Sequence, residues 1–314
     1  DRRGGRAAVT SYLTRRLLIA VPTLLGVATV SFLLMRIIPG DPARVMAGPE
    51  ATPEDVERLR QQLGLTGSIW SQYVEYMTRL LHGDLTISAR TGTPVIDEIT
   101  ARAPATVTLA LLAIVVAVLV GCTLGVLAAL RRDSFTDLLL SGFSVFGVSM
   151  PVYWVGLLLI MLFSVKLGWL PAGGAESWQS VVLPTVALSF FAIGFISRQT
   201  RSAMVETLEL DFIRSVRAKG VGRTAVVIRH GLRNAALPIM TVVGLQFGQL
   251  LGGAVLTETI FAWPGLGRLL IDSISARDFA TVQGTVFVFA VALILVNLLT
   301  DLLYAYADPR IRYD

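Results

Sequence analysis

Long apolar blocks alternate with shorter polar segments along the chain. Six blocks stand out, at about 17–38, 105–130, 138–165, 181–203, 236–257 and 283–305. A helix needs about 20 apolar residues to cross the roughly 30 Å hydrocarbon core of a bilayer. Backbone amides inside lipid must be satisfied within their own segment, which favours helices. The pattern predicts an all-α, polytopic membrane protein with six transmembrane helices.

The first block follows an arginine-rich start, as the apolar core of a signal peptide does. However, the block at 17–38 is longer than such a core, and no small-x-small cleavage site follows it. We therefore expect a retained first transmembrane helix.

The polar stretch 39–103 carries helix signals of its own. The sequence PGDP at 39–42 predicts a turn. Thr52 suits a helix N-cap, with Pro53 at the first helical position and Asp55 closing a capping box. A second helix is expected over 69–82, where Trp70, Tyr73 and Tyr76 suit a membrane–water interface. We expect a small helical insert on the extracytoplasmic side.

Charge sets the expected orientation. The chain has a net charge of +5, and its cations gather at the ends of apolar blocks, which indicates membrane topology rather than nucleic-acid binding. Their bias toward alternate connections predicts that both termini are cytoplasmic, in a plasma (inner) membrane protein. Only 16% of residues are charged and 54% are hydrophobic, which excludes an ordinary soluble domain. The single cysteine, Cys122, excludes a disulfide within the chain.

The sequence holds no catalytic, cofactor-binding or metal-binding constellation. The two histidines, His82 and His230, fall on opposite sides of the membrane in this topology. A nucleotide-binding P-loop needs Gly-Lys-Ser or Gly-Lys-Thr, and neither Lys166 nor Lys219 fits that motif. The chain is therefore not expected to be an enzyme. If ATP drives transport, another subunit would have to hydrolyse it.

Three residues inside the spans are candidates for a pore or gate. Pro151 interrupts the third block, and a broken helix can line a pathway. Asn297 and Asp301 lie four residues apart on one face of the sixth block. A carboxylate in lipid is expensive and is usually paired or functional. A purely structural role stays open for all three.

Glycines four residues apart recur in two of the blocks. The pairs are Gly121/Gly125, Gly244/Gly248 and Gly248/Gly252. Such spacing lets helix backbones approach closely in lipid. It predicts packing rather than a function.

The segment 198–238 is too polar to span the membrane and too basic to lie outside. Residues 199–219 contain neither glycine nor proline, so a helix is expected to continue out of the fourth block until Gly220 and Gly222. A return helix then starts near Val226. A short basic helix presented in this way can dock into a groove of a soluble partner. The alternative is an ordinary positively charged cytoplasmic loop.

This segment resembles the cytoplasmic coupling motif of ABC-importer permeases, EAA-x3-G-x9-I-x-L-P. Gly220 matches its glycine, whereas Arg214, Ser215 and Val216 replace the EAA triplet. The sequences RAKG at 217–220 and RHGLRNAALP at 229–238 resemble the peptide/nickel branch more closely.

Other stretches resemble the same branch. They are PGDP at 39–42, LLHGDL at 80–85, MPVYWVGLLL at 150–159, LGWLPAGG at 167–174, TETIFAWPGLGRLLIDSISARDF at 257–279 and DPRIRY at 308–313. Together they identify the chain as a member of the B-type permease subunits of dipeptide, oligopeptide and nickel ABC importers.

The resemblance implies a type I ABC importer permease fold that forms half of a translocation pore. It implies an N-terminal tail and first helix at 1–38, an extracytoplasmic insert at 39–103, a permease core at 104–307 and a cytoplasmic tail at 308–314. The implied partners are a C-type permease, two ABC ATPases that bind ATP and Mg, and a substrate-binding protein. Peptides are the expected substrates, with nickel, glutathione and haem as alternatives.

Residue roles also follow from the resemblance. A coupling helix at about 206–223 would contact the ATPase through Glu206, Asp211, Arg214, Arg217, Ala218, Lys219, Gly220, Gly222 and Arg223. The turn containing Trp263, Pro264 and Gly265 would contact the binding protein.

Two functions of other classes compete with this interpretation. A stand-alone proton-coupled carrier would need ionisable residues near the bilayer midplane, and only Asp301 comes near that requirement. A membrane-embedded enzyme would need a catalytic cluster, which the sequence lacks.

Overall fold

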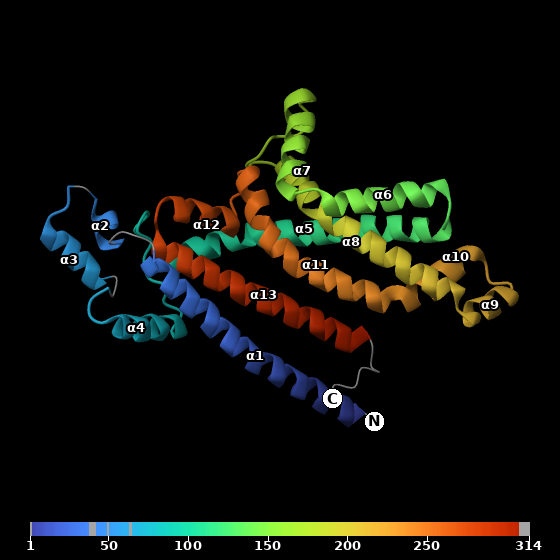
Figure 1. Ribbon diagram of the computed structural model, residues 1–314, viewed down its shortest axis with the longest axis horizontal. Helices are drawn as coiled ribbons and strands as arrows, with labels where there is room; N and C mark the ends of the chain where they lie inside the picture. Colours follow the sequence, from blue (N-terminus) through green and yellow to red (C-terminus); the bar gives the residue numbers. More distant parts are fainter. Residues whose placement is uncertain (1, 38–41, 49, 63–64, 308–314) are drawn as a thin grey trace. The chain divides into compact units, whose positions relative to one another are not determined.

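The computed structural model describes residues 2–37, 42–48, 50–62 and 65–307, and these residues are almost entirely helical (Figure 1). The sequences DPRIRY at 308–313 and most of PGDP at 39–42 lie outside the described residues. The α-helices are α1 (Arg2–Ile37), α2 (Pro42–Ala47), α3 (Pro53–Gln62), α4 (Ile69–Leu81), α5 (Val95–Leu130), α6 (Phe135–Ser149), α7 (Val152–Leu159), α8 (Val182–Glu209), α9 (Asp211–Ala218), α10 (Arg223–Ala225), α11 (Arg233–Ile260), α12 (Leu266–Ser275) and α13 (Phe279–Ala307). Two π-helical segments, Ile160–Lys166 and Val226–Leu232, and one 3-10 helix, Trp178–Val181, join them.

All six apolar blocks are helical, but they do not all form long spans. Within the described residues, four helices are long and apolar enough to cross a membrane: Val95–Leu130, Trp178–Glu209, Arg223–Ile260 and Phe279–Leu302. The first block contributes a shorter apolar stretch, Leu18–Leu34, within α1. The all-α membrane fold is confirmed, while the number of six crossings stays a prediction.

The third block is not the single helix that its apolar run predicts. It divides into α6 and α7, which meet at an angle of 106° (Figure 1). The cause is Pro151, whose ring pushes the preceding Met150 into an extended conformation with ψ 128°. Pro151 also has no N–H to donate to the carbonyl of Gly147, so the α6 ladder stops there.

The chain divides into two compact units. Unit 1 consists of Asp1–Tyr12, Val107–Trp263 and Leu295–Asp314, and unit 2 of Leu13–Thr106 and Pro264–Ile294. The predicted division at residues 38, 103 and 307 refers to the sides of a membrane and stays a prediction.

Glycines bring α8 of unit 1 against its neighbours. A Cβ atom on Gly125 would lie 2.5 Å from the carbonyl oxygen of Ser197, and one on Gly194 would lie 2.5 Å from that of Ser144. A Cβ atom on Gly121 would lie 2.9 Å from the Ile196 Cβ, so the predicted close approach at Gly121 and Gly125 is confirmed. Gly252 differs, because nothing lies within 4 Å of a Cβ placed there.

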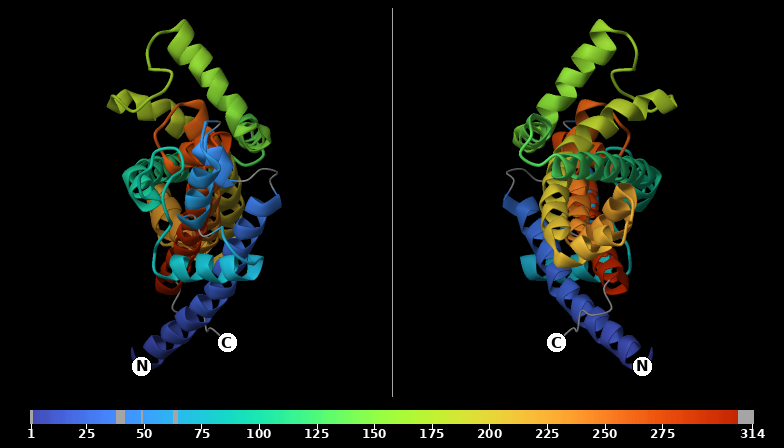
Figure 2. Two further views of the ribbon diagram at one scale, coloured as in Figure 1. Left: turned by 90° about the vertical axis from the view of Figure 1, so that its left-hand side faces the viewer. Right: turned by 90° about the vertical axis from the view of Figure 1, so that its right-hand side faces the viewer.

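Unit 2 contains the two insert helices that the sequence predicts. The capping box of α3 is confirmed: the Asp55 amide donates to the Thr52 hydroxyl, and the Thr52 amide donates to the Asp55 carboxylate. The Thr52 hydroxyl also donates to the Asp55 carboxylate at 2.6 Å, and this bond, together with that from the Thr52 amide, holds the pKa of the Asp55 carboxyl below its usual value. Helix α4 lies across α1 (Figure 2, left). There the Tyr73 ring packs edge-on against Phe32, with centroids 5.2 Å apart, and its hydroxyl lies 2.8 Å from that of Thr29.

Unit 2 also contains a buried hydrogen-bond cluster around Asp278 that sequence patterns do not reveal. The carboxylate of Asp278, which is fully buried, accepts hydrogen bonds from the Ser88 hydroxyl at 2.5 Å and the Ala89 amide at 3.2 Å. It also accepts from the hydroxyl and amide of Thr281 in the first turn of α13. Asp278 thus caps α13 and fastens the loop before α5 to it.

Replacing Asp278 with alanine is expected to release this loop. Hydrogen bonds to a charged group contribute about 1.5–3 kcal/mol, and the buried Ser88 hydroxyl would lose its acceptor while its oxygen still accepts from the Thr91 amide. We expect faster hydrogen–deuterium exchange at residues 86–94 and a lower unfolding temperature. Asp272→Ala is the matched control, because its ion pair with Arg268 is about 40% exposed on both sides. Equal exchange at residues 86–94 in both variants would contradict the role of Asp278 in holding this loop.

Candidate functional site

The segment after α8 folds into a separate short helix. Helix α8 ends at Glu209, Leu210 is extended with ψ 145°, and α9 begins at Asp211. The expected continuous helix over 199–219 is therefore wrong. The break needs neither glycine nor proline, because it is fixed by how α9 packs rather than by local propensity.

Helix α9 is anchored by one side chain and supported by its charges. Ile213 is fully buried, whereas Asp211 and Arg214 are exposed and 3.5 Å apart. Asp211 lies in the first turn and Arg217 in the last turn, so both complement the helix dipole. The result is a short helix with one apolar face inward and a charged face outward.

The two glycines after α9 have different roles. Gly220 has φ +78°, the left-handed conformation that favours glycine just past a helix end. Gly222 has φ −60°, and no atom lies within 4 Å of a Cβ placed there. The turn therefore requires glycine at 220 but not at 222.

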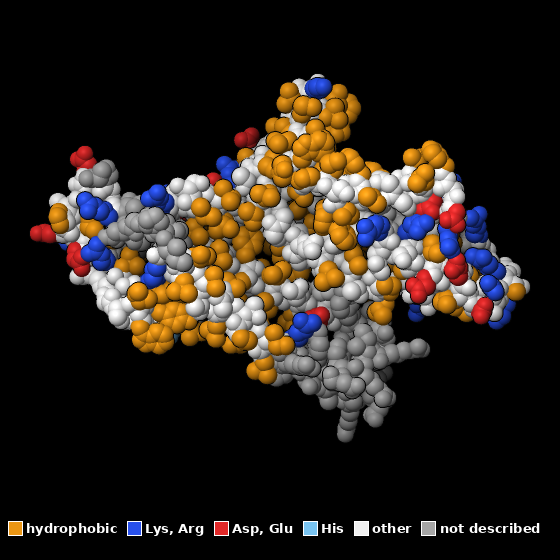
Figure 3. Space-filling view, in the orientation of Figure 1, with side chains coloured by type: hydrophobic (Ala, Val, Ile, Leu, Met, Phe, Trp, Pro, Cys, Tyr) orange, Lys and Arg blue, Asp and Glu red, His pale blue; other side chains and the backbone are white. Residues whose placement is uncertain are grey.

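All nine residues predicted to contact an ATPase are exposed. They lie at the end of α8, along α9 and in the turn that follows. Lysine and arginine side chains gather over α9 and α10 in the space-filling view (Figure 3). The predicted coupling residues are thus exposed on consecutive elements, from the end of α8 to the start of α10.

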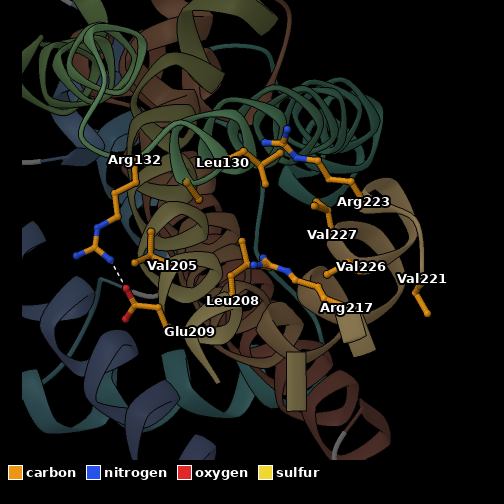
Figure 4. A pocket seen from close by; sticks show the side chains of 11 residues that line it. Leu130, Arg132, Val205, Leu208, Glu209, Arg217, Val221, Arg223, Val226 and Val227 are labelled. Carbon is orange, nitrogen blue, oxygen red and sulfur yellow. Dashed lines mark hydrogen bonds and ion pairs between the residues drawn. The ribbon is translucent and has the colours of Figure 1, made fainter. Parts of the chain in front are cut away.

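A cavity of about 500 Å³ lies beside this surface (Figure 4). Its wall is formed by the C-terminal ends of α5 and α8 and by the segment from α9 to the π-helical turn. The lining residues are Ala129, Leu130, Arg132, Val205, Leu208, Glu209, Arg217, Val221, Arg223, Val226 and Val227. Sequence patterns single out only Arg217 and Arg223 among them.

The cavity combines an apolar floor with a positive rim. Arg132 pairs with Glu209, which joins the loop after α5 to the end of α8. Arg217 extends toward Leu208 and Arg223 toward Leu130 in Figure 4. Neither of these arginines forms an ion pair with any described residue.

A buried ion pair supports the same region from within unit 1. The guanidinium of Arg201 on α8 donates two hydrogen bonds of 2.6 Å to the carboxylate of Asp137 on α6. Asp137 is buried and also accepts from the Asp133 amide. In the sequence, Asp137 and Arg201 each lie at the end of an apolar block, and this position of a charged residue is the signal that could have indicated the pair.

The remaining predicted residues are dispersed. Pro151 lines a second cavity at the α6–α7 break, which neither Asn297 nor Asp301 lines. On α13, Asn297 is exposed and Asp301 is half-buried. In the predicted binding-protein turn, Trp263 and Gly265 are buried and Pro264 is exposed. No group of three potential metal ligands occurs in the described part of the chain.

Family models match most of the sequence. Residues 121–313 match the binding-protein-dependent transport system inner membrane component, and residues 9–110 match its N-terminal domain. The chain belongs to this family. It is a permease subunit of an ABC importer, a multi-pass inner-membrane protein that works with the other components of such a system.

Curated relatives are similar to this chain over almost its full length. The glutathione transport system permease protein GsiC of Escherichia coli O6:H1 is 45% identical, with 96% of this chain and 99% of the relative covered. GsiC of Salmonella paratyphi A is 46% identical, again with 96% of this chain and 99% of the relative covered.

Solved structures support the fold. An inward-facing structure of the MetNI methionine ABC transporter matches 68% of this chain and 97% of its own, with a TM-score of 0.59 and 20% identity. An amino acid ABC transporter solved with histidines has a TM-score of 0.54 and 17% identity, covering 67% of this chain and 94% of its own. At these identities the likeness concerns the fold alone.

Proposed function

We propose that this permease forms half of a translocation pore for short peptides, with glutathione as the favoured cargo. The observation that carries this proposal is the exposed surface of α9 and the segment after it, where Arg217 and Arg223 form no ion pair with any described residue. The relatives named for glutathione transport support the choice of cargo. A cytoplasmic position of both termini follows from the charge bias and belongs to the same proposal.

The proposed assembly contains a C-type permease, two ABC ATPases and a substrate-binding protein. The ATPases bind ATP and Mg, and this chain carries no cofactor. Helix α9 and its turn dock on one ATPase, with Arg217 and Arg223 facing acidic side chains. On the opposite side of the membrane, Pro264 is the exposed member of the turn that meets the binding protein.

The structure offers a physical route for coupling. Residues Arg223–Ile260 form one helical stretch that runs from the coupling turn into the fifth apolar block. Helix α9 contacts the π-helical start of that stretch as well as the end of α8. A push on α9 when the ATPases close therefore reaches two membrane helices, as alternating access requires.

Replacing Gly220 with valine is expected to uncouple transport. A β-branched side chain is strained at φ +78°, which costs roughly 1–2 kcal/mol and disfavours the turn after α9. In the reconstituted importer we expect ATPase stimulation by loaded binding protein, and peptide uptake, to fall at least about fivefold. Gly222→Ala is the control and should retain both.

The reverse ranking, with Gly222→Ala more damaging than Gly220→Val, would contradict the docking role of this turn. Charge reversal at Arg217 and Lys219 tests the electrostatic part separately. We expect it to leave membrane insertion intact while ATPase stimulation and uptake fall together.

A further inference from the structure

A second, open cavity lies beside the break in the third block, within unit 1. Its volume is about 360 Å³, and it lies between the α6–α7 break, the middle of α8 and the middle of α11. Pockets of about 300–1,000 Å³ typically hold small ligands. Its apolar wall includes Leu188, Phe191 and Leu250.

A buried glutamine whose side-chain oxygen is unpaired lines this cavity. Gln246 is 4% exposed, and its side-chain oxygen is buried with no hydrogen-bond partner among the described residues. Buried polar groups are normally satisfied, because leaving one unpaired costs about 1–3 kcal/mol. A primary amide offers one acceptor and two donors, the complement of a peptide group.

The start of α7 lies beside the same cavity and carries N–H groups that have no acceptor within the helix. Val152 and Tyr153 begin the helix, so their N–H groups have no acceptor within it, and Pro151 supplies no side-chain cap. Val152 also lines the cavity. Donors of this kind at a helix start favour a carboxylate. In secondary transporters, the ends of broken helices commonly form substrate sites.

We propose that this cavity is a subsite for the backbone of the translocated peptide. Gln246 pairs with a peptide group, the start of α7 receives a carboxylate, and the apolar wall packs against side chains. The inference rests on the proposed function and refines it, because it assigns the cargo's amide and carboxylate to named groups.

The test uses the complete importer in proteoliposomes, with S-methylglutathione and L-alanyl-L-alanine as probes. Gln246→Leu should lower uptake of both about tenfold while ATPase stimulation by loaded binding protein persists, since the coupling surface is untouched. Thr241→Val is the control: it is an exposed polar-to-apolar change on the same helix, outside the cavity. Unchanged uptake in Gln246→Leu would overturn the subsite. So would loss of subunit assembly in Gln246→Leu alone, because Gln246 would then be a subunit contact.

A second measurement does not depend on the Gln246 variant. Gln249 lines the cavity and is exposed, so Gln249→Cys in a Cys122→Ala background should react with a maleimide. S-methylglutathione delivered during ATP turnover should slow this labelling at least about twofold, and absence of protection would overturn the subsite. A wild-type importer that hydrolyses ATP but takes up neither probe would instead overturn the proposed function, and the subsite with it.

Discussion

Replacing Gly125 with valine is expected to prevent α5 and α8 from packing together. A Cβ at this position would lie 2.5 Å from the Ser197 oxygen, 2.6 Å from the Thr200 Cβ and 3.0 Å from the Arg201 nitrogen. Two of these atoms belong to the backbone of α8, so no rotamer change relieves the collision. Overpacking commonly costs about 1–3 kcal/mol, and we expect at least about 3 kcal/mol here because whole helices must separate.

Thermal unfolding of the purified chain in detergent measures this effect. Gly252→Val is the control, because it adds the same atoms to an apolar helix where nothing lies within 4 Å. We expect Gly125→Val to unfold at a much lower temperature, or to fail to accumulate, while Gly252→Val stays close to the wild type. Similar behaviour of the two variants would show that the close approach of α5 and α8 is not required.

Removing Arg201 is expected to be the second most damaging single change. The Asp137 carboxylate would stay buried without its bidentate partner, and breaking a buried ion pair costs about 3–5 kcal/mol. Arg201 retains 32% exposure, so we expect about 2–4 kcal/mol for Arg201→Ala after allowing for solvent screening. Arg132→Ala is the matched control: its pair with Glu209 is exposed on both sides and should contribute less than about 1 kcal/mol.

A double-mutant cycle separates the ion pair from other effects of Arg201. The variant lacking both charges, Asp137→Ala with Arg201→Ala, should be less destabilised than the sum of the two single variants. Strict additivity of the two losses would contradict a direct pair.

The apolar blocks were predictable because each is a local property of the sequence. Their lengths alone locate helices within α1, α5, α8, α11 and α13. The α3 capping box was predictable for the same reason, since Thr52 and Asp55 are three residues apart. Pro151 predicts an interruption, but its local effect does not set the angle between α6 and α7.

What could not be predicted depends on contacts between distant parts of the chain. The break at Leu210 has no local signal, because leucine favours helix. The separate α9 is instead stabilised by the burial of Ile213, which is a tertiary contact. Arg201 and Asp137 are 64 residues apart, and Arg132 and Glu209 are 77 apart. The coupling surface was therefore located by motif, whereas the cavity beside it needed the fold.

The central claim is that this chain moves its cargo only when separate ATPases drive it. Uptake of S-methylglutathione into proteoliposomes tests this directly, with the binding protein and the cargo supplied outside and ATP enclosed inside, on the side of the ATPases. We predict that uptake requires ATP, the ATPases and the binding protein. A proton gradient should not be able to drive uptake in place of ATP. Uptake by the chain without ATPases, driven by a proton gradient, would contradict the account.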